Sequence, residues 1–285
     1  MKLGLIPASG GMFPVDGVAV TSVARAAEAS GFESIWVGEH VVMAAAPRQD
    51  YPGAAQNRVG PSATGSLPDP IDWLCYAAAV TDTLLLGTAI LILPLHNPLI
   101  MAKRISTLDQ LSGGRVRLGI GVGWSEDEYE AVGETFRTRG RRCDEAVAAM
   151  RALWRESPAS FAGEYVHFPP VHSVPQPVRG AVPVLVGGDS EAAAERAGRI
   201  GDGYFPFGKD LDRLVQLIGT MRRAALDAGR DPDSIELTAL GSRRPDVVAR
   251  LAEIGFTRMV LFLPEPSAEA IERLGEQGRQ LVEGL

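Results

Sequence analysis

Cysteine and histidine are scarce in this sequence of 285 residues, which contains two cysteines and four histidines. Cys75 and Cys143 lie far apart and in no spacing typical of a metal site, so the chain does not indicate a disulfide framework. We interpret both as reduced residues on helices of a cytoplasmic protein. The sequence also lacks an H-E-x-x-H motif, a close cysteine pair and a carboxylate cluster, and we therefore predict no metal.

The chain also has fewer basic than acidic residues. Lys and Arg number 28 against 35 Asp and Glu, which gives a net charge of −7. Nucleic acids and anionic membranes favour basic surfaces, so neither is expected as the main partner. An anionic small molecule held by a local basic pocket remains compatible with this charge, and we expect a small-molecule substrate.

The chain has no hydrophobic run long enough to cross a bilayer. The longest one, Leu84 to Leu95, is interrupted by Gly87 and Thr88 and falls short of the ~20 apolar residues that a spanning helix needs. Residues 1–11 lack the basic head and apolar stretch of a secretory signal, so we expect none.

The sequence does contain a repeated alternation of short apolar runs and longer helical stretches. The runs are continuous rather than alternating, which is typical of strands buried on both faces of a parallel sheet. The expected strands are 3–8, 34–40, 84–94, 116–123, 182–188, 202–208, 234–240 and 256–264. The expected helices are 16–30, 98–111, 139–155, 190–200, 210–228, 245–254 and 267–282.

Eight strand–helix units in a chain of this length predict an α/β fold, a closed (β/α)8 TIM barrel formed by one domain over 1–285. An open doubly wound sheet is the alternative. Two insertion loops interrupt the alternation, at about 41–70 and 157–181. The first leaves the carboxyl end of a strand, where barrels place their active sites, so it is either a substrate loop or a surface insertion.

The segment LGTAILILPLHNPLIMAKRISTLDQLSGGRVRLGIGVGW (86–124) resembles the luciferase-like monooxygenase superfamily, and within it the oxidoreductases that depend on the deazaflavin coenzyme F420. Residues 121–145 and 183–206 extend the resemblance to later strands and helices. It implies a (β/α)8 fold that takes up a flavin or deazaflavin at the barrel mouth, reduction or monooxygenation chemistry, and a homodimer.

Glu39 and His40 end the second apolar strand, where a charged pair is poorly explained by packing. The resemblance implies an acid and a histidine here, near the redox face of the cofactor ring. Histidine side chains have a reference pKa near 6.5, so His40 could exchange a proton with substrate while hydride moves. We therefore predict His40 and Glu39 as catalytic, with a structural hydrogen-bonded pair as the alternative.

Two strand segments are expected to contact the cofactor. The resemblance implies that the chain at Thr88 and Ala89 approaches the ring, often with a non-proline cis peptide, although Thr88 could also be simply buried. Gly119, Gly121 and Gly123 face one way along the fourth strand, and the missing side chains make room for a flat ring or for tight barrel layers. Gly121, Val122 and Gly123 are expected to contact the ring.

Gly187, Gly188 and Ser190 end the fifth strand and open a helix, where free backbone N–H groups attract anions. We expect the cofactor phosphate here, and Ser190 could also cap the helix. Asp189 would repel a phosphate and is expected to point away. Arg139 could clamp a phosphate or carboxylate, or could belong to a solvated basic helix face.

Taken together, the sequence predicts an F420-dependent oxidoreductase in which the cofactor supplies hydride and His40 handles the proton. An FMN-dependent monooxygenase of the same superfamily is the alternative cofactor assignment; the compact length and lack of a late insertion favour F420. A barrel that binds cofactor without catalysis is a further alternative.

Overall fold

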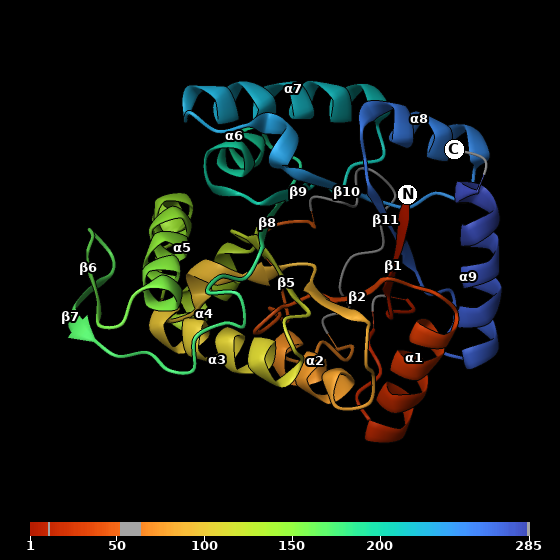
Figure 1. Ribbon diagram of the computed structural model, residues 1–285, viewed down its shortest axis with the longest axis horizontal. Helices are drawn as coiled ribbons and strands as arrows, with labels where there is room; N and C mark the ends of the chain where they lie inside the picture. The colour runs from red at the N-terminus through yellow and green to blue at the C-terminus, as the bar shows by residue number, and fades with distance from the viewer. Residues whose placement is uncertain (11, 52–63, 284–285) are drawn as a thin grey trace.

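The computed structural model describes residues 1–285 with the exception of 11, 52–63 and 284–285. Its strands surround a common axis and its helices lie outside them (Figure 1). The barrel strands are β1 (Lys2–Ile6), β2 (Ser34–Val37), β3 (Leu85–Thr88), β4 (Leu91–Ile92), β5 (Val116–Gly121), β8 (Val184–Gly187), β9 (Gly203–Phe205), β10 (Glu236–Leu240) and β11 (Arg258–Phe262). All are parallel to their neighbours, which confirms the predicted barrel.

Closure of the sheet follows from pairing between the first and last strands. Leu5 of β1 lies opposite Leu261 of β11 and also opposite Ile35 of β2. β3 pairs with both β2 and β5, so the ring has no open edge there. The eight expected strands are therefore all present, and the open doubly wound alternative is wrong.

The third expected strand, 84–94, is not continuous. β3 ends at Thr88, the Ala89–Ile90 peptide bond is cis, and β4 then pairs only with β5. Residues 93–95 form a short 3₁₀ helix, η2 (Leu93–Leu95). An apolar run alone does not reveal such an interruption, because β3, β4 and η2 are all buried.

Every expected helix is present in the structure. The α-helices are α1 (Gly17–Ala29), α2 (Pro70–Ala78), α3 (Pro98–Leu111), α4 (Glu126–Val132), α5 (Arg139–Arg155), α6 (Glu191–Ile200), α7 (Leu211–Asp227), α8 (Pro245–Ile254) and α9 (Ala268–Val282). Short 3₁₀ turns η3 (Phe136–Thr138) and η4 (Pro232–Ser234) accompany them. Two helices, α2 and α4, were not expected.

Local signals account for both unexpected helices. Asp69 caps α2 by accepting from the N–H groups of Ile71 and Asp72, and Pro70 occupies the first turn, where proline is tolerated. Ser125 caps α4, and Gly133 ends it in a left-handed conformation with φ 82°. α4 has only seven residues, too few to show helical periodicity.

A tryptophan fills the barrel interior. Trp36 is fully buried, donates its indole N–H to Ser34 at 2.8 Å and meets Phe205 edge to face. A Cβ on Gly87 would lie 2.2 Å from the Trp36 ring, and one on Gly4 would lie 2.7 Å from its nitrogen. The barrel is therefore a packed core over most of its length rather than a pore.

A charged cluster lies at the amino-terminal end of the barrel. The Arg258 guanidinium, 1% exposed, pairs with Glu33 at 2.6 Å and also with Glu236. Burial lowers the pKa of Arg258, but the two carboxylates outweigh it, so that pKa lies above its ordinary value. The cluster holds β2, β10 and β11 together at this end.

The two insertions differ in structure. Residues 157–181 contain an antiparallel hairpin, β6 (Ala159–Ala162) with β7 (His167–Val171), at one edge of the molecule (Figure 1). In the first insertion, 52–63 lie outside the described residues. Arg48 attaches the preceding part to α4 by pairing with Asp127 and, at 2.6 Å, with Glu130.

Both cysteines lie on helices, as expected, and neither forms a disulfide. Burial raises the pKa of Cys75 and raises that of Cys143 to about 12. Within the described part of the chain, no helix combines the length and apolar character needed to cross a membrane.

Candidate active site

Four neighbouring strand ends bring the expected site residues to one rim of the barrel. These segments are 38–40 after β2, 89–92 after β3, 121–125 at the end of β5 and 187–190 at the end of β8. Because these strands are parallel and adjacent, the segments meet at the carboxyl-terminal mouth, where barrel enzymes place their chemistry.

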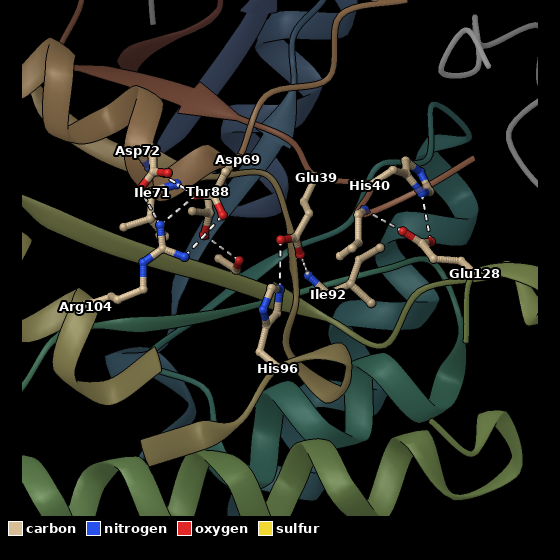
Figure 2. A network of polar contacts seen from close by, with 12 residues as sticks. Glu39, His40, Asp69, Ile71, Asp72, Thr88, Ile92, His96, Arg104 and Glu128 are labelled. Carbon is tan, nitrogen blue, oxygen red and sulfur yellow. Dashed lines mark hydrogen bonds and ion pairs between the residues drawn. The ribbon is translucent and has the colours of Figure 1, made fainter. Parts of the chain in front are cut away.

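Glu39 is buried under the rim. One carboxylate oxygen accepts from the N–H of Ile92 at 2.6 Å, and the other lies 2.8 Å from Nε2 of His96 (Figure 2). Its side chain is 3% exposed. Glu39 bonds to His96 and not to His40, so the alternative of one hydrogen-bonded Glu39–His40 pair is wrong.

His96 is a site residue that the sequence did not single out. Burial lowers the pKa of His96, but its hydrogen bond to Glu39 and the charge of that carboxylate outweigh the effect and raise the pKa above its ordinary value. The signal available in the sequence was its position, directly after the third apolar run and in the same rim as Glu39. The pair fixes η2 against the β2 end.

His40 is held by a residue far along the chain. Its Nδ1 lies 2.9 Å from Oε2 of Glu128, and the other oxygen of Glu128 accepts from the N–H of Val41 at 2.7 Å (Figure 2). The Glu128 side chain is fully buried, whereas 11% of His40 is exposed. Only Nε2 of His40 remains for another partner, so its tautomer and ring direction are set by Glu128.

The glycine face of β5 is covered by the protein's own chain. A Cβ on Gly119 would lie 2.0 Å from the Thr88 carbonyl oxygen, and one on Gly121 would lie 1.7 Å from Cδ1 of Ile90. A Cβ on Gly187 would lie 2.6 Å from Ile90. The expectation that these missing side chains leave an open slot is therefore wrong, because the space receives the segment from Thr88 to Ile90.

Thr88 and Ala89 are placed differently. Thr88 is buried and donates its hydroxyl to the Gly119 carbonyl at 2.6 Å (Figure 2), which supports the simply buried interpretation. The cis peptide lies one bond later than expected, between Ala89 and Ile90. Ala89 and Ile90 are both half-buried, so this segment, rather than the buried Gly121 and Gly187, presents a surface at the mouth.

An aromatic ring lies beside His40. The Trp124 ring meets His40 and Tyr51 edge to face, with centroids 5.8 Å apart in both pairs. Nε1 of Trp124 is buried and has no hydrogen-bond acceptor among the residues that the structure describes. A buried donor without a partner is unusual and marks a place where a ligand atom could accept. Sequence reasoning did not single out Trp124.

Val122 and Gly123 form the turn before Trp124. The Val122 carbonyl accepts from the hydroxyl of Tyr129 at 2.7 Å. Gly123 has φ 66°, and a Cβ on it would lie 2.8 Å from Ile92, so glycine is required on both grounds. Val122 and Gly123 are half-buried and lie in the same rim as the Ala89–Ile90 segment.

The end of β8 forms a helix start, as expected. Ser190 caps α6 by accepting from the N–H of Ala193 at 3.1 Å, and Gly188 has φ 127°. Asp189 points away from this helix start and accepts from the N–H groups of Phe207 and Gly208. Because Ser190 already accepts from the N–H of Ala193, the structure supports its role as a helix cap, and the phosphate site at this helix start stays a prediction.

Arg139 begins α5 and lies over an aromatic ring. Its guanidinium carbon is 3.7 Å from the centroid of Phe136, and Nη1 donates to the Phe136 carbonyl at 3.0 Å. Its Nε is buried without an acceptor in the described chain. These contacts place Arg139 against the η3 turn, and no described contact joins it to Ser190.

No group of three or more metal-ligating side chains comes together among the described residues. His40 and His96 each pair instead with a single carboxylate.

Comparison with known proteins identifies a matching family and similar chains. Residues 13–277 match the model of a family described as luciferase-like monooxygenase. An uncharacterised protein of Mycobacterium tuberculosis is 35% identical over 257 residues, which cover 89% of this chain and 90% of that protein. An F420-dependent glucose-6-phosphate dehydrogenase of Kineococcus radiotolerans is 34% identical over 220 residues, covering 74% of this chain and 59% of its own length.

A solved structure shows the same fold. The crystal structure of a monooxygenase from Streptomyces bottropensis superposes with a TM-score of 0.76 and 22% sequence identity. The match covers 100% of this chain and 99% of the other.

Proposed function

Since the chain belongs to the luciferase-like monooxygenase family, we propose that it is an oxidoreductase that uses coenzyme F420 and transfers a hydride between this deazaflavin and an organic substrate. The similarity to an F420-dependent dehydrogenase supports the choice of cofactor. The observation that carries the proposal is His40, held in one orientation by Glu128 at the mouth of the barrel.

The residues of the mouth fit a flat ring with an anionic tail. The half-buried Ala89–Ile90 segment offers an apolar surface against which a ring can pack, and Trp124 offers a buried N–H with no acceptor in the described chain. The start of α6 at Ser190 offers backbone N–H groups for the phosphate. When bound, the deazaflavin supplies a carbon that gives or takes the hydride.

His40 handles the proton in this proposal. Its Nδ1 faces the Glu128 carboxylate, so Nε2 is the atom that gives a proton to, or accepts one from, a substrate oxygen. Glu128 holds the ring in place and stabilises the protonated form by its charge. Glu39 does not take part in the transfer, because both of its oxygens are engaged by Ile92 and His96.

A binding titration tests the choice of cofactor. The purified protein is titrated with F420 and separately with FMN, and absorbance and affinity are recorded. We expect F420 to bind more tightly. Tighter binding of FMN, with oxygen uptake by the reduced complex, would overturn the proposal in favour of a flavin monooxygenase. Failure of both to bind would indicate a barrel without redox function.

A substitution tests the role of His40. His40→Ala should lower the rate of hydride transfer by about 10²- to 10⁴-fold while leaving F420 affinity nearly unchanged, because a positioned acid–base contributes this much. His167→Ala is the matched control, since His167 is exposed on the β6–β7 hairpin. Equal rates for both variants would exclude His40 from the chemistry.

A further inference from the structure

A second hollow opens at the opposite end of the barrel from the mouth. It has a volume of about 170 Å³. Charged residues dominate its lining, and they come from the start of β5, the carboxyl-terminal turns of α3 and α5, and the connections that lead into β8 and β9. They are Asp109, Arg117, Arg151, Arg155, Arg179 and Asp202.

The two acidic residues of this cavity already have partners. Asp202 accepts from the N–H of Val184 at 2.9 Å and pairs with Arg151 at 2.8 Å. Asp109 accepts from the N–H of Val178 at 2.9 Å. Within the described chain, neither carboxylate forms an ion pair with any of the other three guanidinium groups of the cavity.

Arg117, Arg155 and Arg179 have no carboxylate partner among the described residues. Arg117 donates only to the carbonyl of its neighbour Val116, at 3.0 Å. Arg155 lies in the last turn of α5, where a cation is favoured by the helix dipole. That effect cannot explain Arg117 or Arg179, which lie on a strand and on a loop.

Arg117 is the half-buried member of this group, since Arg155 and Arg179 are exposed. Burial lowers the pKa of its guanidinium. Glu236 and Glu33 raise that pKa by more than Arg258 and Arg179 lower it, but not by enough to offset the burial. Arg155 and Arg179 line the same cavity and have no ion-pair partner within the described chain. An anion between the three guanidinium groups would give them a shared counter-charge.

We propose that this cavity binds a tetrahedral oxyanion of the phosphate type, either free phosphate or the phosphoryl group of a small phosphomonoester. The planar guanidinium forms paired hydrogen bonds to phosphate oxygens, and Arg117, Arg155 and Arg179 provide three such groups around one space. The volume is well below the roughly 300–1,000 Å³ of pockets for drug-sized ligands, so a phosphoryl-sized group fits and an entire cofactor does not.

This site is separate from the candidate active site. Arg117 is near the first residue of β5, whereas Gly121 and Gly123 are at its carboxyl end. The proposal therefore does not depend on F420 binding. It also differs from the phosphate position suggested at Ser190, which lies at the mouth.

Calorimetric titration of the full-length protein with inorganic phosphate, glycerol phosphate and malonate tests the proposal. Ionic strength is held constant with chloride, because the interaction is electrostatic. We expect saturable binding of one phosphate or phosphomonoester per chain at this site, and the tighter of the two identifies the source. Malonate is expected to bind more weakly, since its carboxylates lack the tetrahedral arrangement.

Substitutions locate the binding. Arg179→Gln and Arg155→Gln change exposed side chains and should each weaken phosphate binding by about tenfold, as should Arg117→Gln if it folds. Arg250→Gln is the control, since Arg250 pairs with Glu253 on α8. Absence of saturable binding, equal affinity in Arg179→Gln, or tighter binding of malonate would each overturn the proposal. If phosphate bound at Ser190 instead, Arg179→Gln would bind it with the same affinity as wild type.

Discussion

The imidazole of His40 and the carboxylate of Glu128 lie 2.9 Å apart although 88 positions separate them in the chain. The same carboxylate accepts from the N–H of Val41, so it fixes both the ring and the backbone beside it. Because Glu128 is fully buried, its carboxylate is held in one position, and its contact with His40 fixes the orientation of the imidazole.

Replacing Glu128 by Gln should lower the rate of hydride transfer by about tenfold or more with little change in KM. The amide can still accept from Val41, but it carries no charge to stabilise a protonated His40. Steady-state kinetics of the purified variant provide the measurement.

Glu130→Gln is the matched control for this variant, because Glu130 lies on the same helix and pairs with the exposed side chain of Arg48. Its rate should stay within about twofold of wild type. If the two variants lost the same share of the rate, the rate would depend on the structure of α4 and not on the charge of Glu128.

Gly121→Ala should destabilise the protein by about 1–3 kcal/mol, because the new Cβ would lie 1.7 Å from Ile90 and force it to move. Urea denaturation measures the change. Adding Ile90→Ala to this variant should recover part of the loss, since the two side chains compete for one space.

Gly219→Ala controls for the generic effect of replacing glycine. Gly219 is within α7, and a Cβ there would make only an ordinary contact, 3.6 Å from Arg223. This change should stabilise the helix by about 0.4–1 kcal/mol. A neutral Gly121→Ala would contradict the close contact with Ile90.

The pair of His96 and Glu39 should make stability depend on pH. The pKa of His96 is raised in the folded state. The stability that the His96–Glu39 pair adds to the fold is therefore complete below about pH 6.5, and it is lost as the pH rises through the raised pKa. The stability difference between wild type and His96→Gln should therefore be larger at pH 6 than at pH 8.5.

Urea denaturation at the two pH values measures this difference. His172→Gln is the comparison, since His172 is exposed and its ring contacts the hydroxyl of Ser157 rather than a carboxylate. If the loss of stability in His96→Gln grew with pH, the pKa of His96 would be lowered by folding rather than raised.

Arg258→Met should cost about 2–3 kcal/mol of stability near neutral pH, because it leaves Glu33 and Glu236 facing each other without their shared cation. The value is below the roughly 3–5 kcal/mol for a fully buried pair, since both carboxylates are partly exposed. Arg250→Met, which breaks an exposed pair with Glu253, should change stability by less than about 0.5 kcal/mol.

Acid should reduce the cost of Arg258→Met. Burial raises the pKa of Glu33, but Arg258 outweighs it and holds that pKa below the ordinary range. The stability that the ionised Glu33 adds by pairing with Arg258 is therefore present above about pH 4.3, and it is lost as the pH falls through the lowered pKa. Denaturation curves at pH 7 and pH 3.5 should show the smaller difference at low pH.

The barrel was predictable because strand and helix signals recur along the chain and are local. Each apolar run is short and bounded, and closure follows from their number. The interruption at Ala89–Ile90 was not predictable from the residues, since its apolar neighbours read as one strand. The structure explains it, because Ile90 fills the space left by the missing side chains of Gly121 and Gly187, which lie on other strands.

The candidate site was predictable in position and only partly in detail. Polar residues at strand ends pointed to the mouth, so His40 and Ser190 were identified correctly as rim residues. The partners of His40 and Glu39 were not, because Glu128 and His96 come from other segments and no pattern within 34–40 indicates them. Pairing across strand ends is set by tertiary packing rather than by spacing.

The attachment of Arg48 and His40 to α4 has a consequence for how the site forms during folding. Both residues lie between β2 and α2, whereas their partners Asp127 and Glu128 follow β5. A nascent or proteolytic fragment that stops before residue 120 could fold its early strands yet would lack the carboxylates that orient the imidazole. Competence for proton transfer should thus arise late, only after the fifth barrel strand has docked and its helix has closed over the rim.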